Sequence, residues 1–100
     1  MEKSHGNFTI VQRKKNALDG LPEDVVDIYF QLERDLKKFS GKPAGQGWDN
    51  YGPYKQCGKN VYHCHLKYRF VALWKIEKKN GVTFCKVHYV GTRENIPTRI

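Results

Sequence analysis

The chain has 100 residues, of which 39% are hydrophobic and 13% aromatic. This length suits a single domain with a modest core and is too short for two domains, and the apolar content excludes a disordered chain. The net charge of +8 is unevenly placed, because residues 1–40 carry seven Lys or Arg against seven Asp or Glu, whereas residues 41–100 carry eleven against three. A basic half of this kind favours an acidic partner, such as nucleic acid or a negatively charged protein.

The sequence also bears on the compartment. No run approaches the ~20 apolar residues of a membrane span, and the N-terminal segment lacks an apolar stretch of signal-peptide length. Cys57, Cys64 and Cys85 are an odd number of cysteines without CxxC spacing, so a disulfide framework is not expected. We therefore expect a cytoplasmic protein without a membrane partner.

The first elements in chain order are an edge strand and two helices. Residues 8–12 are β-prone and predict the edge strand, and residues 15–19 predict a short helix that ends at Gly20. Pro22 suits the first position of a second helix over residues 23–38, the longest one expected. Its apolar side chains recur at helical spacing, as Val25, Ile28, Tyr29, Leu32, Leu36 and Phe39.

Residues 40–59 are rich in Gly and Pro and predict a long loop within the one domain. The loop contains Trp48, Tyr51 and Tyr54, whose rings need a surface to pack on. They either cap the edge of the core or stack on bases beside the basic half of the molecule.

Three strands are predicted at residues 61–66, 69–76 and 82–90, and an Asn80-Gly81 turn joins the last two as an antiparallel hairpin. The middle strand is apolar at nearly every position, as expected of a central strand covered on both sides. Side chains alternate along a strand, so the first strand divides its residues between two faces. Those expected to face the helices are Tyr62, Cys64 and Leu66, and those expected to face away are His63 and His65. The third strand likewise places one set, Cys85, Val87 and Tyr89, opposite another, Lys86 and His88.

The polar residues of these strands form the main functional candidate: His63, His65, Arg69, Lys86, His88 and Arg93. A histidine can take or give a proton near neutral pH, and arginines can hold a phosphate and its growing transition-state charge. The set therefore suits phosphodiester cleavage without a metal. Lys59 and Lys67 flank the first of the three strands and join Lys86 and His88 as candidate RNA contacts.

An alternative for the same region is a zinc site. The residues of ligand type there are Cys57, His63, Cys64, His65, Cys85 and His88. Alternation sends Cys64 away from both neighbouring histidines and Cys85 away from His88, and no standard ligand spacing occurs. We expect no metal and no cofactor, and interpret the cysteines as small buried hydrophobic residues.

Several segments resemble the RelE/ParE superfamily of bacterial and archaeal toxins from type II toxin-antitoxin systems. They read FTIVQRKKNALDGLPEDVVDIYFQL, VYHCHLKYRFVALWKI and YVGTRE, with a Gly-rich loop containing a tryptophan between the first two. The resemblance covers residues 7–97 and implies one α+β domain of β-α-α-β-β-β order, with an antiparallel sheet and two helices packed on one face.

The resemblance implies two possible activities. RelE-branch toxins are endoribonucleases that cleave mRNA on the ribosome, whereas ParE-branch relatives poison DNA gyrase, so the fold alone does not decide between them. The alternative to a nuclease is a non-catalytic ParE-like toxin, or a basic RNA- or protein-binding module that acts on a topoisomerase or another partner. A cognate antitoxin with an acidic segment is expected in either case, because it would complement the basic face.

Residue roles also follow from the resemblance. His63 and His65 occupy the strand positions where RelE-type toxins place catalytic basic residues. Arg69 matches the arginine that opens the next strand and contacts the scissile phosphate, and Arg93 falls where the family carries Arg or His. The chain departs from the family at its end, where many members carry a Tyr and residues 95–100 read NIPTRI.

Overall fold

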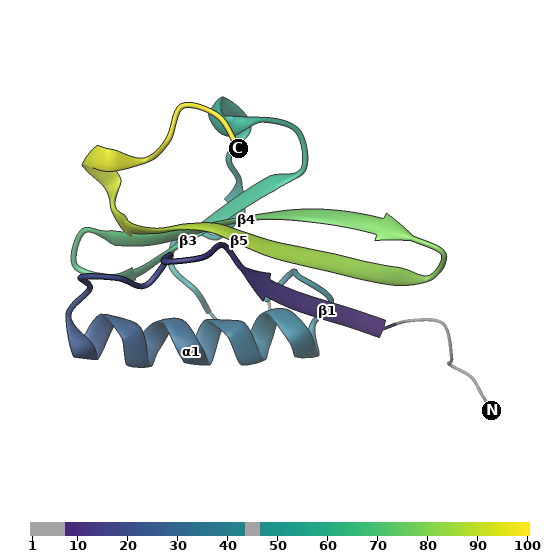
Figure 1. Cartoon of the computed structure of the whole chain (residues 1–100), viewed down its shortest axis with the longest axis horizontal. Coiled ribbons are helices and arrows are strands. Elements are labelled where there is room, and N and C mark those ends of the chain that lie inside the picture. The colour runs from purple at the N-terminus through teal and green to yellow at the C-terminus, as the bar shows by residue number, and fades with distance from the viewer. Residues whose placement is uncertain (1–7, 44–46) are drawn as a thin grey trace.

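The computed structural model describes residues 8–43 and 47–100. The elements run in the order β1 (Phe8–Arg13), α1 (Glu23–Lys38), β2 (Gly52–Pro53), the 3-10 turn η3 (Lys55–Cys57), β3 (Val61–Lys67), β4 (Phe70–Lys79), β5 (Val82–Thr92) and the 3-10 turn η4 (Arg93–Asn95). The five strands form one sheet in the order β1-β5-β4-β3-β2. Helix α1 covers one face of the sheet, and η3 and the C-terminal segment lie on the other (Figure 1).

Helix α1 has the bounds that the sequence predicts. It follows Pro22, has Glu23 and Asp24 in its first turn, and has lysines in its last turn, which complements the helix dipole. Val25, Tyr29, Leu32 and Leu36 are buried on one side of it, whereas Ile28 and Phe39 are only half-buried. The apolar stripe therefore packs on the sheet along most of the helix.

The predicted short helix at residues 15–19 is wrong. This stretch consists of turns, closed by hydrogen bonds such as those from the amides of Ala17 and Asp19 to the carbonyls of Lys14 and Asn16. Asn16 has φ of 67° and Gly20 φ of 75°, and residues in this left-handed region cannot continue a right-handed helix. Within the described residues the fold has one α-helix instead of two.

The sheet is mixed, so the prediction of a wholly antiparallel sheet is wrong at one edge. Strand β1 lies at the edge, as expected, but pairs in parallel with β5, from Phe8 opposite Val82 to Arg13 opposite Val87. The pairs β2–β3, β3–β4 and β4–β5 are antiparallel. A hairpin turn imposes antiparallel pairing, whereas β1 reaches β5 through α1 and most of the chain, which leaves its direction unconstrained.

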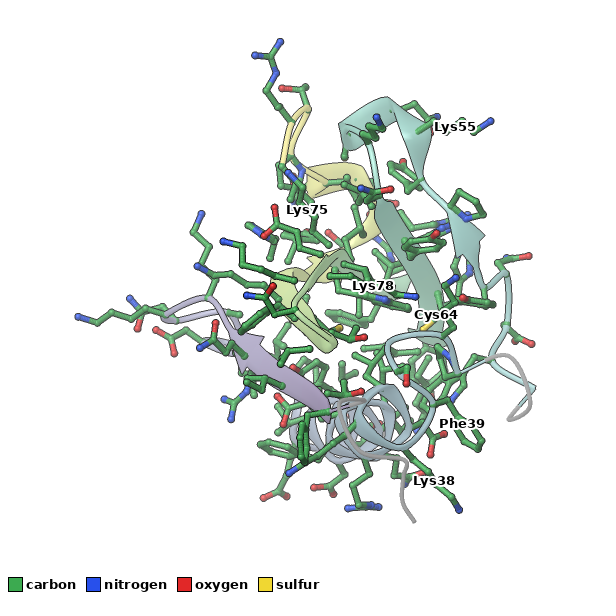
Figure 2. The ribbon with its side chains drawn as sticks, turned by 90° about the vertical axis from the view of Figure 1, so that its right-hand side faces the viewer. Lys38, Phe39, Lys55, Cys64, Lys75 and Lys78 are labelled. Carbon is green, nitrogen blue, oxygen red and sulfur yellow. The ribbon has the colours of Figure 1, made fainter. Side chains whose placement is uncertain are left out.

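Hydrophobic side chains are buried on both faces of β4, as predicted for a central strand. The face toward α1 buries a core that includes Tyr29, Leu32, Cys64, Trp74 and Val87. The opposite face buries a smaller cluster, on which the C-terminal isoleucines pack: Cys57, Val61, Val71 and Leu73, covered by Tyr54, Tyr89, Ile96 and Ile100. Figure 2 shows Cys64 on the helix side, toward Lys38 and Phe39, and Lys75 on the opposite side.

The aromatic residues of the 40–59 loop cap the core, which confirms the first of the two interpretations for Trp48 and Tyr51. The Trp48 indole donates to an Asp35 carboxylate oxygen at 2.9 Å. The Tyr51 ring stacks between Tyr62 and Trp74, with centroid distances of 6.2 and 6.1 Å. Part of this loop also forms β2, which the sequence does not predict. Among the described residues, no helix is long and apolar enough to cross a membrane.

Two β-bulges alter which way side chains point. Leu73 pairs with Tyr89 and Trp74 with Val87, so His88 is an extra residue in β5. Cys85 and Val87 share the face toward α1, but Tyr89 packs on the opposite cluster, so the prediction that all three share a face is wrong for Tyr89. The second irregularity lies between His65 and Lys67 in β3.

Candidate functional site

His63 and His65 lie together on the face of the sheet opposite α1, as strand alternation predicts. Their ring centroids are 6.1 Å apart with an interplanar angle of 62°, and both side chains are half-buried. We call these two residues the histidine pair. Tyr62, Cys64 and Leu66 of the same strand pack on the helix side.

The short strand β2 holds the ring of His63. Gly52 pairs with His63 in the sheet, and the Gly52 carbonyl oxygen lies 3.0 Å from His63 Nδ1. A carbonyl can only accept, so Nδ1 carries the hydrogen and Nε2 remains for other partners. The Tyr54 ring packs against this imidazole at 4.8 Å between centroids, which fixes its orientation.

His65 is held by the Asp49-Asn50 turn. Its backbone amide donates to the Asp49 carbonyl at 2.8 Å, and the Asn50 side-chain nitrogen lies 3.3 Å from its Nδ1. Burial lowers the pKa of His65, with further lowering by the nearby charges of His63 and Arg93 and a partial offset by Asp49. A lowered pKa keeps this imidazole neutral, and able to accept a proton, near neutral pH.

Arg69 and Arg93 meet at the end of the sheet next to His65. The backbone amide of Arg93 donates to the Arg69 carbonyl at 3.0 Å. Arg69 lies in the two-residue turn before β4 and not within the strand, which begins at Phe70. Its guanidinium is 3.9 Å from a Glu94 carboxylate oxygen, and its side chain is 64% exposed. Such an exposed pair is weak, so the Arg69 side chain can move onto a bound phosphate.

The structure does not bring all the predicted residues to this place. Lys59 is exposed just before β3, at the strand end far from Arg69. Lys67 Nζ lies 2.8 Å from Asp24 Oδ2 of helix α1, because the irregularity in β3 turns it toward the helix. Their hydrogen bond lowers the pKa of Asp24 and raises that of Lys67.

Lys86 and His88 form a separate group. Leu73, which pairs with His63 on one side and Tyr89 on the other, is fully buried beneath the C-terminal residues. Leu73 and the C-terminal residues that cover it divide this face of the sheet. The histidine pair lies on one side of them, and Lys86 and His88 lie on the other. The residues that sequence places in one constellation are therefore two clusters.

Sequence reasoning missed three contributors to the site. Asn50 and Gly52 position the histidines from the loop, and only the observed β2 pairing shows this. Tyr89 also lies on this face, where its hydroxyl donates to the Thr92 carbonyl at 2.7 Å. A Cβ placed on Gly91 would lie 2.5 Å from the Tyr89 hydroxyl oxygen. A glycine inside a strand often marks such a close approach. Gly91 is therefore the one sequence feature that could have indicated the position of Tyr89.

Within residues 8–43 and 47–100, no group of three or more His, Cys, Asp and Glu side chains could hold a metal ion. The three cysteines are buried and unpaired with one another. Burial raises the pKa of the Cys64 and Cys85 thiols to about 12, so these thiols stay protonated and behave as apolar core residues.

Comparison with known proteins supports a likeness of fold. No family model matches the sequence, and no curated protein matches it. Among solved structures, the fold is similar to that of the YoeB/ParE toxin from Agrobacterium tumefaciens, with a TM-score of 0.64 and 9% sequence identity, covering 83% of this chain and 97% of that one. The likeness is one of fold, an α+β arrangement that in the described residues packs one helix against a mixed five-stranded sheet.

Proposed function

We propose that this chain is the toxin component of a type II toxin-antitoxin system and a ribosome-dependent endoribonuclease that cleaves mRNA without a metal. The observation that carries the proposal is the histidine pair, with Arg93 close to His65 and Arg69 beside Arg93, on the sheet face that α1 leaves uncovered. A fold similar to that of a YoeB/ParE toxin supports it.

The proposed reaction is an internal transfer at one phosphate. The ribose 2′-oxygen attacks the adjacent phosphorus and loses its proton to one histidine, while the other histidine gives a proton to the departing 5′-oxygen. The products are a 2′,3′-cyclic phosphate and a free 5′-hydroxyl. Arg69 and Arg93 stabilise the charge that builds on the non-bridging phosphate oxygens, a role suited to guanidinium groups.

The surroundings of the two rings suggest which histidine does which step. His65 is the base, because its lowered pKa leaves it neutral before substrate arrives. His63 is then the acid: in its doubly protonated form Nδ1 donates to the Gly52 carbonyl, and Nε2 carries the proton that passes to the departing 5′-oxygen.

The test is cleavage of mRNA on programmed ribosomes. Arg69→Ala should lower the rate by ~10²–10³ with much less loss of binding, since a donor of this kind acts mainly in the transition state. His63→Ala and His65→Ala should each cost on the order of 10²–10⁴. The double variant should lose less than the product of the single losses if the two act as a unit.

Arg34→Ala is the matched control, because Arg34 is an exposed arginine on α1, which covers the other face of the sheet. It should cleave like the parent. If folded Arg69→Ala and His65→Ala proteins arrest growth as strongly as the parent, the nuclease proposal fails. A non-cleaving toxin that acts on a topoisomerase or another protein then becomes the better account.

The proposal includes a protein partner and a compartment. An antitoxin with an acidic segment would silence the site by covering the basic face, where its carboxylates would complement the arginines. Action on translating ribosomes places the protein in the cytoplasm. Growth arrest on expression of this chain alone, and its rescue by co-expression of a candidate acidic antitoxin, tests the partner, and cell fractionation tests the compartment.

A further inference from the structure

A second basic cluster lies on the same sheet face, away from the histidine pair. It consists of Lys75, Lys86 and His88, with Lys14 alongside, and we call it the lysine cluster. These residues come from β4, from β5 and from the segment just after β1, which are neighbours in the sheet. The proposed cleavage reaction uses none of them.

The cluster brings like charges together, with Glu77 as the one carboxylate side chain among the residues that line its pocket. Lys75 and Lys86 are directly opposite one another in the antiparallel β4–β5 pair, and like charges at such positions destabilise a sheet. Within residues 8–43 and 47–100, neither lysine has a carboxylate within ion-pair distance. A bound anion would relieve this repulsion.

The surroundings of His88 show the same excess of positive charge. Burial lowers its pKa, and the charges of Lys86, Lys14 and Lys75 lower it further, with only Glu77 opposing them. The charged groups near His88, from β4, β5 and the segment just after β1, are therefore three cations and one carboxylate.

The cluster lines a pocket with an aromatic wall. The pocket has a volume of about 320 Å³ and is lined by Gln12, Lys75, Glu77, Phe84, Lys86, His88 and Ile100. Phe84 is half-buried, and its partner across the β1–β5 pair is Ile10, which is 41% exposed. Lysines beside a partly accessible aromatic ring suit single-stranded RNA, because the cations hold phosphates and the ring can stack on a base.

We propose that the lysine cluster is a second RNA subsite, in which Lys75, Lys86 and His88 hold a backbone phosphate and Phe84 stacks on the adjacent base. The C-terminal residues separate this subsite from the histidine pair, so one strand of RNA that occupies both must cross over Ile100. The subsite deepens the proposed nuclease function, but it concerns binding and can be tested without cleavage.

The experiment measures binding of fluorescein-labelled oligouridylate by anisotropy over a range of salt concentrations. Lys75→Gln/Lys86→Gln should weaken binding about tenfold and reduce the salt slope by roughly 0.7 for each RNA phosphate that the variant no longer neutralises. Lys78→Gln/Lys79→Gln is the matched control, since it removes the same charge from exposed positions at the β4–β5 turn. It should change affinity far less.

Two further measurements separate a specific subsite from a general charge effect. Phe84→Leu should weaken oligouridylate binding about tenfold and leave binding of an abasic oligoribonucleotide unchanged. In NMR titrations, the pKa of His88 should rise when oligouridylate is added, because a phosphate reverses the local excess of positive charge. Circular dichroism melting should confirm that each variant is folded.

Equal loss of affinity in both double-lysine variants would overturn the subsite and leave only non-specific attraction to a basic protein. An unchanged His88 titration in the presence of bound oligouridylate would overturn it as well. A different result would show that the nuclease proposal fails while the subsite holds. Oligouridylate binding would still depend on Lys75, Lys86 and Phe84, but mRNA on ribosomes would stay intact.

Discussion

At the residue scale, the environment of His65 determines the form of the pH profile. Its pKa lies below the ordinary value near 6.5 because the ring is half-buried and His63 and Arg93 repel a second positive charge. If His65 is the base, it must be neutral to act. On the acid side, cleavage should therefore fall as pH drops below about 6.5, through the lowered pKa of His65.

The measurement is the single-turnover rate of mRNA cleavage on ribosomes as a function of pH, with parent and His65→Ala proteins. The acid limb of the profile should disappear in the residual activity of His65→Ala. An acid limb that persists in His65→Ala and disappears in His63→Ala would mean that His63 is the base, and would reverse the proposed roles.

Also at this scale, the sequence predicts side-chain direction well where a strand is regular. Alternation places His63 and His65 on one face and Cys64 on the other, as the structure shows. It fails at Tyr89, because the extra residue His88 shifts the alternation by one, and a bulge leaves no periodic trace in the sequence. The roles of all the site residues stay predictions.

At the element scale, the C-terminal segment serves as a cover for the sheet face that α1 does not reach. Ile96 and Ile100 pack on Val61, Val71 and Leu73, and the Ile100 amide donates to the Cys57 carbonyl at 2.9 Å. Ending the chain after Asn95 should lower the free energy of unfolding by about 2–4 kcal/mol, since two half-buried isoleucines are removed and leucine and valine become exposed.

Urea denaturation checks this expectation, with Arg99→Ala as the control because Arg99 is an exposed residue of the same segment. The control should unfold like the parent. A truncated protein as stable as the parent would show that the segment adds nothing to the fold.

Elements differ in how far the sequence predicts them. Helix α1 is predictable to the residue, because proline, acidic residues, an apolar stripe and lysines all agree on its limits. The turn at residues 15–20 is not, since helix-compatible residues such as Ala17 and Leu18 outweigh the left-handed position at Asn16. Strand β2 is two residues long and exists only through its pairing with β3, so it has no local pattern of its own.

At the scale of the whole molecule, the net charge of +8 should govern the ribosome association that the proposed function requires. Several RNA phosphates would release counterions together on binding, so the logarithm of the association constant should fall steeply and linearly with the logarithm of salt concentration. Ribosome co-sedimentation between 50 and 200 mM salt, about the range over which this effect is marked, provides the measurement. A flat response would point to a mainly apolar surface directed at protein.

The parallel pairing of β1 with β5 has a consequence for folding of the nascent chain. Strand β1 pairs with β5, from Phe8 opposite Val82 to Arg13 opposite Val87, so the sheet cannot close until β5 has been synthesised. Arg93 follows β5, and it too can join His65 only after β5 has been made. Long-range pairing of this kind folds slowly, so a nascent chain that ends before β5 can assemble neither the closed sheet nor the arrangement of His65 with Arg93.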